Sequence, residues 1–131
     1  VETRPYDGIG TLLERLRQAG VRTAVVSNKP DRTTRTLAAR FFPELDGAMG
    51  QREGIASKPA PDMVRAALDQ LHAAPEEALY VGDSEVDVAT ARNAGLDMIG
   101  VAWGFRGRAA LEAAGAPLVA DTPEQLLDML Q

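Results

Sequence analysis

Apolar residues recur along the chain in two patterns, one typical of helices and one typical of buried strands. Helical spacing appears first over residues 9–16, and Gly20 follows as a stop signal. A short apolar run with β-branched residues comes next, over residues 23–26, and it ends at Ser27-Asn28. The order is therefore a helix, a glycine turn and a buried strand.

The same alternation continues to the end of the chain. We expect helices over 32–40 with Asp31 as a cap, over 61–72, from a Ser84 cap to Gly95, and over the last residues around Leu126. We expect strands over 48–50, 78–81, 98–101 and 118–119. Strand runs this apolar imply a parallel sheet that helices cover on both faces. The predicted fold class is therefore α/β, a three-layer αβα sandwich that occupies residues 1–131 as one domain.

Composition and charge narrow the classes of function. The 131 residues are 45% hydrophobic and 25% charged, as in soluble globular proteins, and their net charge is −5. An acidic chain without a basic face argues against nucleic acid as a partner. The sequence has no cysteine, which excludes thiolate chemistry, and we find neither a membrane-spanning run nor a signal peptide. We therefore expect a cytoplasmic protein that binds neither nucleic acid nor membrane.

Polar side chains follow two of the predicted strands at the points where these strands end. Ser27 and Asn28 come after the strand over 23–26, and Asp83 comes after the strand over 78–81. In open parallel sheets, ligands bind beyond the carboxyl ends of the strands. The hydroxyl of Ser27 and the amide of Asn28 can hold phosphate oxygens there. The alternative is a turn in which both side chains satisfy local backbone groups.

Lys58 is a third candidate, in the loop sequence Ser-Lys-Pro-Ala-Pro-Asp, which two prolines stiffen. A fixed ammonium group can neutralise charge on a phosphoryl group or on an attacking carboxylate. The alternative is an ordinary solvated lysine.

Asp83 and Asp87 stand four residues apart in the sequence GDSEVD, about one helical turn. Two carboxylates at that distance suit Mg²⁺, which takes oxygen ligands. Ser84 and Asp87 also fit a capping box, in which Asp87 reaches back to the Ser84 amide. Both readings stay open, because Asp83 can bind metal while Asp87 orients the loop.

Read in order, VVSNK, SKPAPD, YVGDSEVDVATARNAG and WGFR resemble the haloacid dehalogenase superfamily of phosphohydrolases, and most of all its phosphoglycolate phosphatase-like branch. The resemblance covers nearly the whole chain and implies a Rossmann-like fold. It implies catalytic and phosphate-binding roles for Ser27 and Lys58, with Asn28 as a further phosphate-binding residue. It also implies that Asp83 binds Mg²⁺, with Asp87 as its acidic partner.

The first motif of that superfamily, an apolar strand followed by Asp-x-Asp-Gly-Thr, has no match in the sequence. PYDGIGTLL offers a single aspartate, Asp7, with no buried strand before it, and we interpret Asp7 as a turn or cap residue. The resemblance places the missing nucleophile strand at the centre of the sheet, followed by a cap domain. It thus implies the carboxyl-terminal part of a phosphatase, in which an amino-terminal segment or a second copy completes the sheet.

The resemblance implies Mg²⁺-dependent hydrolysis of a small phosphate monoester by the complete protein, through an aspartyl-phosphate. Phosphoglycolate is the first expected substrate, and a sugar phosphate, pyrophosphate or nucleotide is the alternative. We expect these 131 residues to be inactive alone. A phospho-acceptor receiver domain is disfavoured, because its motifs run in another order. A non-catalytic interaction module derived from a phosphatase is the remaining alternative.

Overall fold

The computed structural model describes residues 9–103 and 107–130. Asp7 and residues 104–106 of the WGFR stretch therefore lie outside the described residues. In chain order the elements are α1 (Ile9–Gln18), β1 (Ala24–Pro30), α2 (Asp31–Phe41), β2 (Gly47–Gln51), α3 (Asp62–Leu71), the 3₁₀ turn η1 (Pro75–Glu77), β3 (Leu79–Gly82), α4 (Glu85–Ala94), β4 (Asp97–Val101), α5 (Gly107–Ala113), β5 (Val119–Ala120) and α6 (Pro123–Leu130). The predicted alternation of helices and strands is confirmed.

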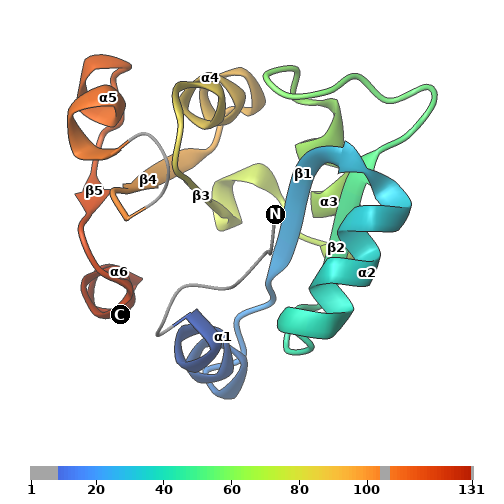
Figure 1. The fold of residues 1–131 in the computed structure, drawn as a ribbon, viewed down its shortest axis with the longest axis horizontal. Coiled ribbons are helices and arrows are strands. Elements are labelled where there is room, and N and C mark those ends of the chain that lie inside the picture. Colours follow the sequence, from blue (N-terminus) through green and yellow to red (C-terminus); the bar gives the residue numbers. More distant parts are fainter. Residues whose placement is uncertain (1–8, 104–106, 131) are drawn as a thin grey trace.

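The strands run parallel but form two separate sheets. β1 pairs with β2, while β3 pairs with β4 and β4 pairs with β5. Figure 1 shows the two groups on opposite sides of the view, with no strand drawn between β1 and β3. The α/β class with parallel pairing is therefore confirmed, and the break in the sheet falls between the strands that carry Ser27 and precede Asp83.

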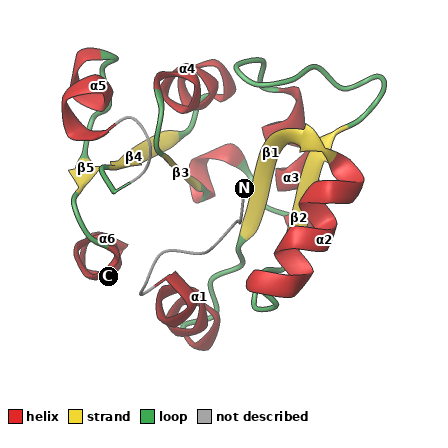
Figure 2. Cartoon of the chain, in the orientation of Figure 1, coloured by secondary structure: helices red, strands yellow, loops and turns green. Residues whose placement is uncertain are grey.

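Helices cover the strands on two sides, as Figure 2 shows. One buried cluster joins α3, α4 and α5 to β3 and β4, and it includes Leu68, Tyr80, Met98 and Leu111. A second cluster joins α1 and α6 to β4 and β5 through Leu12, Ile99, Val101, Ala120 and Leu126. These two cores on opposite faces give the three-layer αβα arrangement.

The local signals around α4 act as the sequence predicts, whereas Asp31 does not. Ser84 caps α4 by accepting a hydrogen bond from the amide of Asp87, and Gly95 ends the helix with a left-handed backbone. Asp31 makes no capping bond and is instead the first residue of α2. Its carboxylate accepts the Gly50 amide at 2.9 Å and pairs with Arg35 at 2.7 Å, so β2 and the next helical turn hold it.

Two elements have no counterpart among the sequence predictions, namely η1 and α5. Leu111 of α5 is fully buried in the first core cluster, so this helix covers β4 and β5. No helix in residues 9–103 and 107–130 is long and apolar enough to cross a membrane.

Strand β3 leaves apolar surface exposed beside the break in the sheet. Its side chains alternate, with Tyr80 and Gly82 buried and with Leu79 and Val81 exposed at 39% and 43%. In a parallel sheet covered on both faces, all four positions are normally buried. The exposed face of β3 is therefore incomplete in these 131 residues.

Candidate active site

Lys58 lies at the centre of the candidate site, in the loop between β2 and α3. Its backbone N–H donates to Asn28 Oδ1 at 2.8 Å, and its carbonyl accepts from Asn28 Nδ2 at 3.2 Å. Because Asn28 belongs to β1, these two bonds attach the loop to the carboxyl end of that strand.

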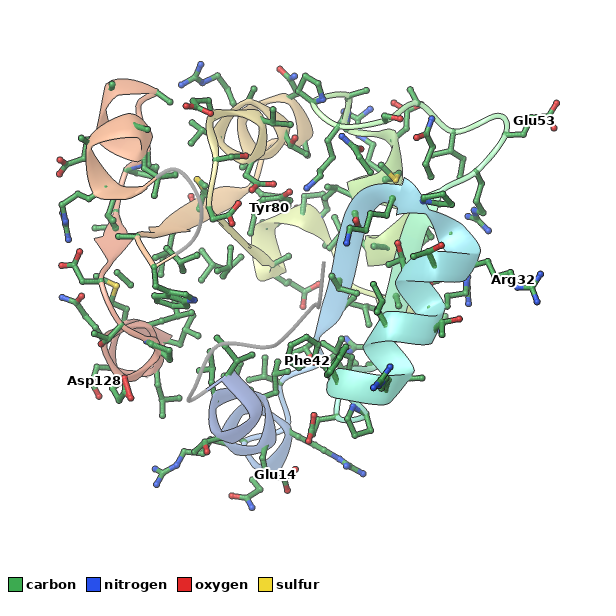
Figure 3. All side chains as sticks on the ribbon, in the orientation of Figure 1. Glu14, Arg32, Phe42, Glu53, Tyr80 and Asp128 are labelled. Carbon is green, nitrogen blue, oxygen red and sulfur yellow. The ribbon has the colours of Figure 1, made fainter. Side chains whose placement is uncertain are left out.

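The ammonium group of Lys58 points the other way, towards α4 and β3. Its Nζ lies 2.8 Å from Asp87 Oδ1 and 3.4 Å from the hydroxyl oxygen of Tyr80. The Tyr80 hydroxyl in turn donates to the same Asp87 oxygen at 2.6 Å. Lys58 therefore joins the carboxyl-terminal half of β1 to the segment that follows β3. Tyr80 lies near the centre of the view in Figure 3.

Asp87 has a donor for each of the roughly four lone-pair positions of a carboxylate. Lys58 and Tyr80 donate to Oδ1, while the Asp83 amide donates to Oδ2 at 2.9 Å and the Ser84 hydroxyl at 3.3 Å. The expected reach of Asp87 back to a backbone amide is present, although the amide is that of Asp83 rather than Ser84. A direct metal bond from Asp87 stays a prediction, and its contacts favour the alternative role of orienting the loop.

The electrostatics of this group follow from burial and pairing. Burial raises the pKa of Asp87, but the Lys58 charge and the hydrogen bonds from Lys58, Tyr80 and Asp83 outweigh it and hold that pKa below its ordinary value. Burial, together with the neighbouring Asp87 charge, raises the pKa of Tyr80 far above its ordinary value. At neutral pH the group is therefore an ion pair with a neutral phenol that donates to the carboxylate.

Lys58 retains capacity to bind a ligand. An ammonium group has three hydrogens, and Asp87 and Tyr80 accept two of them. The third can be donated to an anionic oxygen. The Lys58 side chain is 14% exposed, so this charge lies largely out of solvent, where electrostatic interactions are stronger.

Ser27 and Asp83 are each linked to this ion pair. Ser27 directly precedes Asn28, which binds the Lys58 backbone, and Asp83 donates its amide to Asp87. Ser27 Oγ accepts the amide of Lys29 at 3.1 Å, which leaves its own hydrogen for donation. Lys29 is exposed. Asp83 directly follows β3 and is half-buried, and its amide is fixed by Asp87. Asp83 therefore stands at the end of β3, as predicted. Ser27 instead lies within β1, because the strand does not end at Ser27 but continues to Pro30, which still pairs with β2.

The described residues fit Mg²⁺ only in part. Asp83 offers one carboxylate at the carboxyl end of a strand, and Mg²⁺ is often bound by one or two carboxylates with waters and substrate phosphates. However, no three histidine, cysteine or acidic side chains in residues 9–103 and 107–130 gather into a metal site. Any such site would need ligands beyond these residues.

Sequence reasoning missed three residues that build the site. Tyr80 was read only as part of an apolar strand, although it is the sole aromatic residue in ALYVGD. Asn93 donates to the carbonyl of Pro59 at 2.9 Å and so holds the Lys58 loop from α4. Gly82 allows Asp87 to pack against the strand, since a Cβ at position 82 would lie 2.5 Å from Asp87 Cγ.

The sequence matches the model of a known family, and the match agrees with this geometry. Residues 1–95 match the family of haloacid dehalogenase-like hydrolases. This span is more than half of the chain and contains Ser27, Asn28, Lys58, Asp83 and Asp87. The chain belongs to the haloacid dehalogenase-like hydrolase family.

Two of the relatives with assigned names are phosphatases. The chain is 33% identical over 133 residues to an N-acetylmuramic acid 6-phosphate phosphatase of Pseudomonas aeruginosa, covering 99% of this chain and 59% of that protein. It is 34% identical over 107 residues to a phosphoglycolate phosphatase of Xanthomonas campestris pv. campestris, covering 77% of this chain and 47% of that protein.

The fold is also similar to that of a solved structure. A provisionally named phosphoglycolate phosphatase from Lactobacillus delbrueckii subsp. bulgaricus superposes with a TM-score of 0.96 at 43% identity, covering 99% of this chain and 55% of that protein. The chain thus spans about half the length of the relatives that it matches.

Proposed function

We propose that these residues form the carboxyl-terminal part of a phosphatase that hydrolyses a small phosphate monoester. The observation that carries the proposal is the Lys58 ammonium group, held against Asp87 between the ends of β1 and β3. Phosphoryl transfer is catalysed mostly by positioning and by charge stabilisation, and a fixed cation at that position supplies both.

Each residue has a role in this proposal. Lys58 donates its third hydrogen to a non-bridging oxygen of the phosphoryl group, and Ser27 donates its hydroxyl hydrogen to another. Asp87 and Tyr80 orient the ammonium group by accepting two of its hydrogens. Asp83 is the residue that would hold Mg²⁺, which would supply further stabilisation of negative charge when bound.

The nucleophile belongs to the part of the protein beyond this sequence, as the resemblance implies. There a carboxylate would form a bond to phosphorus while the bond to the substrate oxygen breaks, and water would then cleave the aspartyl-phosphate to release phosphate. The cap domain that governs substrate choice would also lie beyond it. Phosphoglycolate is the first candidate substrate, supported by the name of the Xanthomonas relative, and a sugar phosphate is next, supported by the Pseudomonas relative.

Two further expectations belong to the same proposal. An amino-terminal segment of the longer protein, or a second copy, would fill the break between β1 and β3. A cytoplasmic location stays a prediction from the sequence.

A phosphatase assay with Mg²⁺ tests the proposal on the longer natural protein and on these 131 residues alone. We expect turnover of phosphoglycolate or a sugar phosphate by the longer protein and none by the 131-residue chain. Lys58→Met and Asp83→Asn should each lower kcat by about two or more powers of ten, since members of a catalytic unit do not substitute for one another. Lys29→Met is the matched control, because Lys29 is an exposed lysine near the same strand end.

The outcomes separate the candidate functions. A longer protein that binds phosphate analogues but hydrolyses no ester would favour the non-catalytic interaction module. Turnover that survives Lys58→Met and Asp83→Asn would refute the assigned roles. Robust turnover by the 131-residue chain would mean that the nucleophile lies within it.

A further inference from the structure

Asn28 binds the backbone of Lys58 with both ends of its side-chain amide. Its Oδ1 accepts the Lys58 N–H at 2.8 Å, and its Nδ2 donates to the Lys58 carbonyl at 3.2 Å. Only one orientation of the amide satisfies both bonds, because an N–H must face the carbonyl and the oxygen must face the N–H. The two bonds therefore turn the plane of the Asn28 amide towards Lys58.

The remaining attachments of the same loop come from the other half of the molecule. Asn93 of α4 donates to the Pro59 carbonyl at 2.9 Å, and the Lys58 side chain pairs with Asp87 of α4. Asn28 alone among these partners belongs to β1, whose sheet shares no strand pairing with the sheet of β3 in the described residues. Asn28 is thus the side chain that ties the lysine loop to β1.

We propose that Asn28 is a positioning residue that acts through Lys58, rather than a phosphate ligand. This proposal rests on the proposed function for its consequence in catalysis. Asn28 follows Ser27 directly, so holding the Lys58 backbone to Asn28 sets the separation between the Ser27 hydroxyl and the Lys58 ammonium group. Those two groups bind the same phosphoryl group in the proposed mechanism, and a misplacement of about 1 Å can cost roughly 100-fold in rate.

The two roles predict different couplings between Asn28 and Lys58. A phosphate ligand contributes its own contact, so removing it lowers the rate whether or not Lys58 is present. A residue that acts only by placing Lys58 has nothing left to place once the ammonium group is gone. Residues that share one interaction give non-additive effects in a double-mutant cycle.

The experiment uses the longer natural protein with Asn28→Ala, Lys58→Met and the double variant. We expect Asn28→Ala to lower kcat roughly 10- to 100-fold with a smaller change in KM. In the Lys58→Met background the same substitution should cause no further loss. Gln18→Ala is the control, since Gln18 is an exposed amide that contacts Glu14 within α1.

A second measurement does not depend on activity. Hydrogen exchange of the Lys58 amide should accelerate at least tenfold in Asn28→Ala, because that N–H loses its acceptor. Asn28→Asp keeps an acceptor oxygen but loses the donor, so it should retain most of the protection; it also serves if Asn28→Ala fails to fold.

Two results would overturn the proposal. One is a loss of kcat on Asn28→Ala that is as large without the Lys58 ammonium group as with it. The other is unchanged exchange of the Lys58 amide in Asn28→Ala. A wild-type protein without phosphatase activity would instead refute the proposed function, while the exchange measurement would still decide whether Asn28 holds Lys58.

Discussion

Lys58 Nζ lies 2.8 Å from Asp87 Oδ1, and this ion pair joins the loop before α3 to the first turn of α4. The two side chains are 14% and 9% exposed, so the pair is largely shielded from solvent. Burial of a charge is costly unless it is paired and hydrogen-bonded, and here the carboxylate receives three more donors. Removing either partner should therefore affect stability as well as binding.

Asp87→Asn should destabilise the protein by roughly 1–3 kcal/mol at neutral pH, because it leaves the Lys58 charge without its partner. Urea denaturation of the wild type and the variant measures the difference. Asp128→Asn is the control, since Asp128 is an exposed acid on α6, labelled in Figure 3. Equal losses in the two variants would contradict the assigned role of the ion pair.

The Asp87 contribution should depend on pH in a defined direction. The pKa of Asp87 in the folded state lies below its ordinary value of 3.8, so the folded state binds this proton less readily than the unfolded state. The contribution is complete above 3.8 and is lost as the pH falls from there through the folded-state pKa. The stability difference between wild type and Asp87→Asn, followed by urea denaturation in acid, should shrink over that range. A difference that grows with acidity would show that Asp87 is not stabilised as a carboxylate.

Tyr80→Phe should cost about 1 kcal/mol of stability, because the hydroxyl both donates to Asp87 at 2.6 Å and accepts from Lys58. It should also raise the pKa of Asp87, since the bond from Tyr80 favours the charged carboxylate. An NMR titration of the Asp87 carboxyl carbon measures the second effect. In an Asp87→Asn background the cost of Tyr80→Phe should be smaller, and an equal cost would mean that the hydroxyl does not act through Asp87.

Much of this site follows from sequence because its signals are local. Ser84 and Gly95 bound α4 through backbone hydrogen bonding within a few residues, and such caps can be read directly. The strand end at Asp83 follows from an apolar run in the same way. The apolar run before Ser27 predicts too short a strand, because β1 continues through polar residues to Pro30. The grouping of Lys58 with these two segments came from the order of the motifs, and the structure brings Lys58 into contact with Asn28 and Asp87.

The parts that sequence did not predict depend on contacts between distant segments. Asp31 looked like a helix cap, but the Gly50 amide lies 19 residues away in sequence and only the fold brings it to the carboxylate. Asn93 and Pro59 are likewise 34 residues apart. The helix α5 lacks a strong amphipathic signal in its seven residues, and its single fully buried side chain, Leu111, is explained only by the strands beneath it.

Gly82→Ala should disrupt the site without a change in charge. A Cβ there would lie 2.5 Å from Asp87 Cγ and 2.7 Å from Asp87 Oδ2, so the carboxylate must move away from Lys58. We expect a loss of roughly 1–3 kcal/mol, the range of strained or overpacked core substitutions. Thermal unfolding and the Lys58 amide exchange rate report it. Gly10→Ala is the matched control, because no atom lies within 4 Å of its Cβ position and alanine favours helix α1. An unchanged Gly82→Ala protein would show that α4 can shift freely.

The break between β1 and β3 should make the 131-residue chain self-associate. β3 exposes Leu79 and Val81, and neither β1 nor β3 has a strand partner on the side of the break among the described residues. Unpaired strand edges with apolar side chains are templates for pairing with another chain. We expect concentration-dependent association in analytical ultracentrifugation, reduced in a Leu79→Ser, Val81→Ser variant.

Leu118→Ser is the control for that variant, since Leu118 is 55% exposed and directly precedes β5, away from the break. In the longer natural protein, the same double substitution should lower stability instead of changing self-association. There a segment filling the break would bury Leu79 and Val81, so replacing both should lower the free energy of unfolding by about 2 kcal/mol or more. A monomeric 131-residue chain, together with a longer protein that tolerates the double substitution, would show that nothing packs on this face of β3.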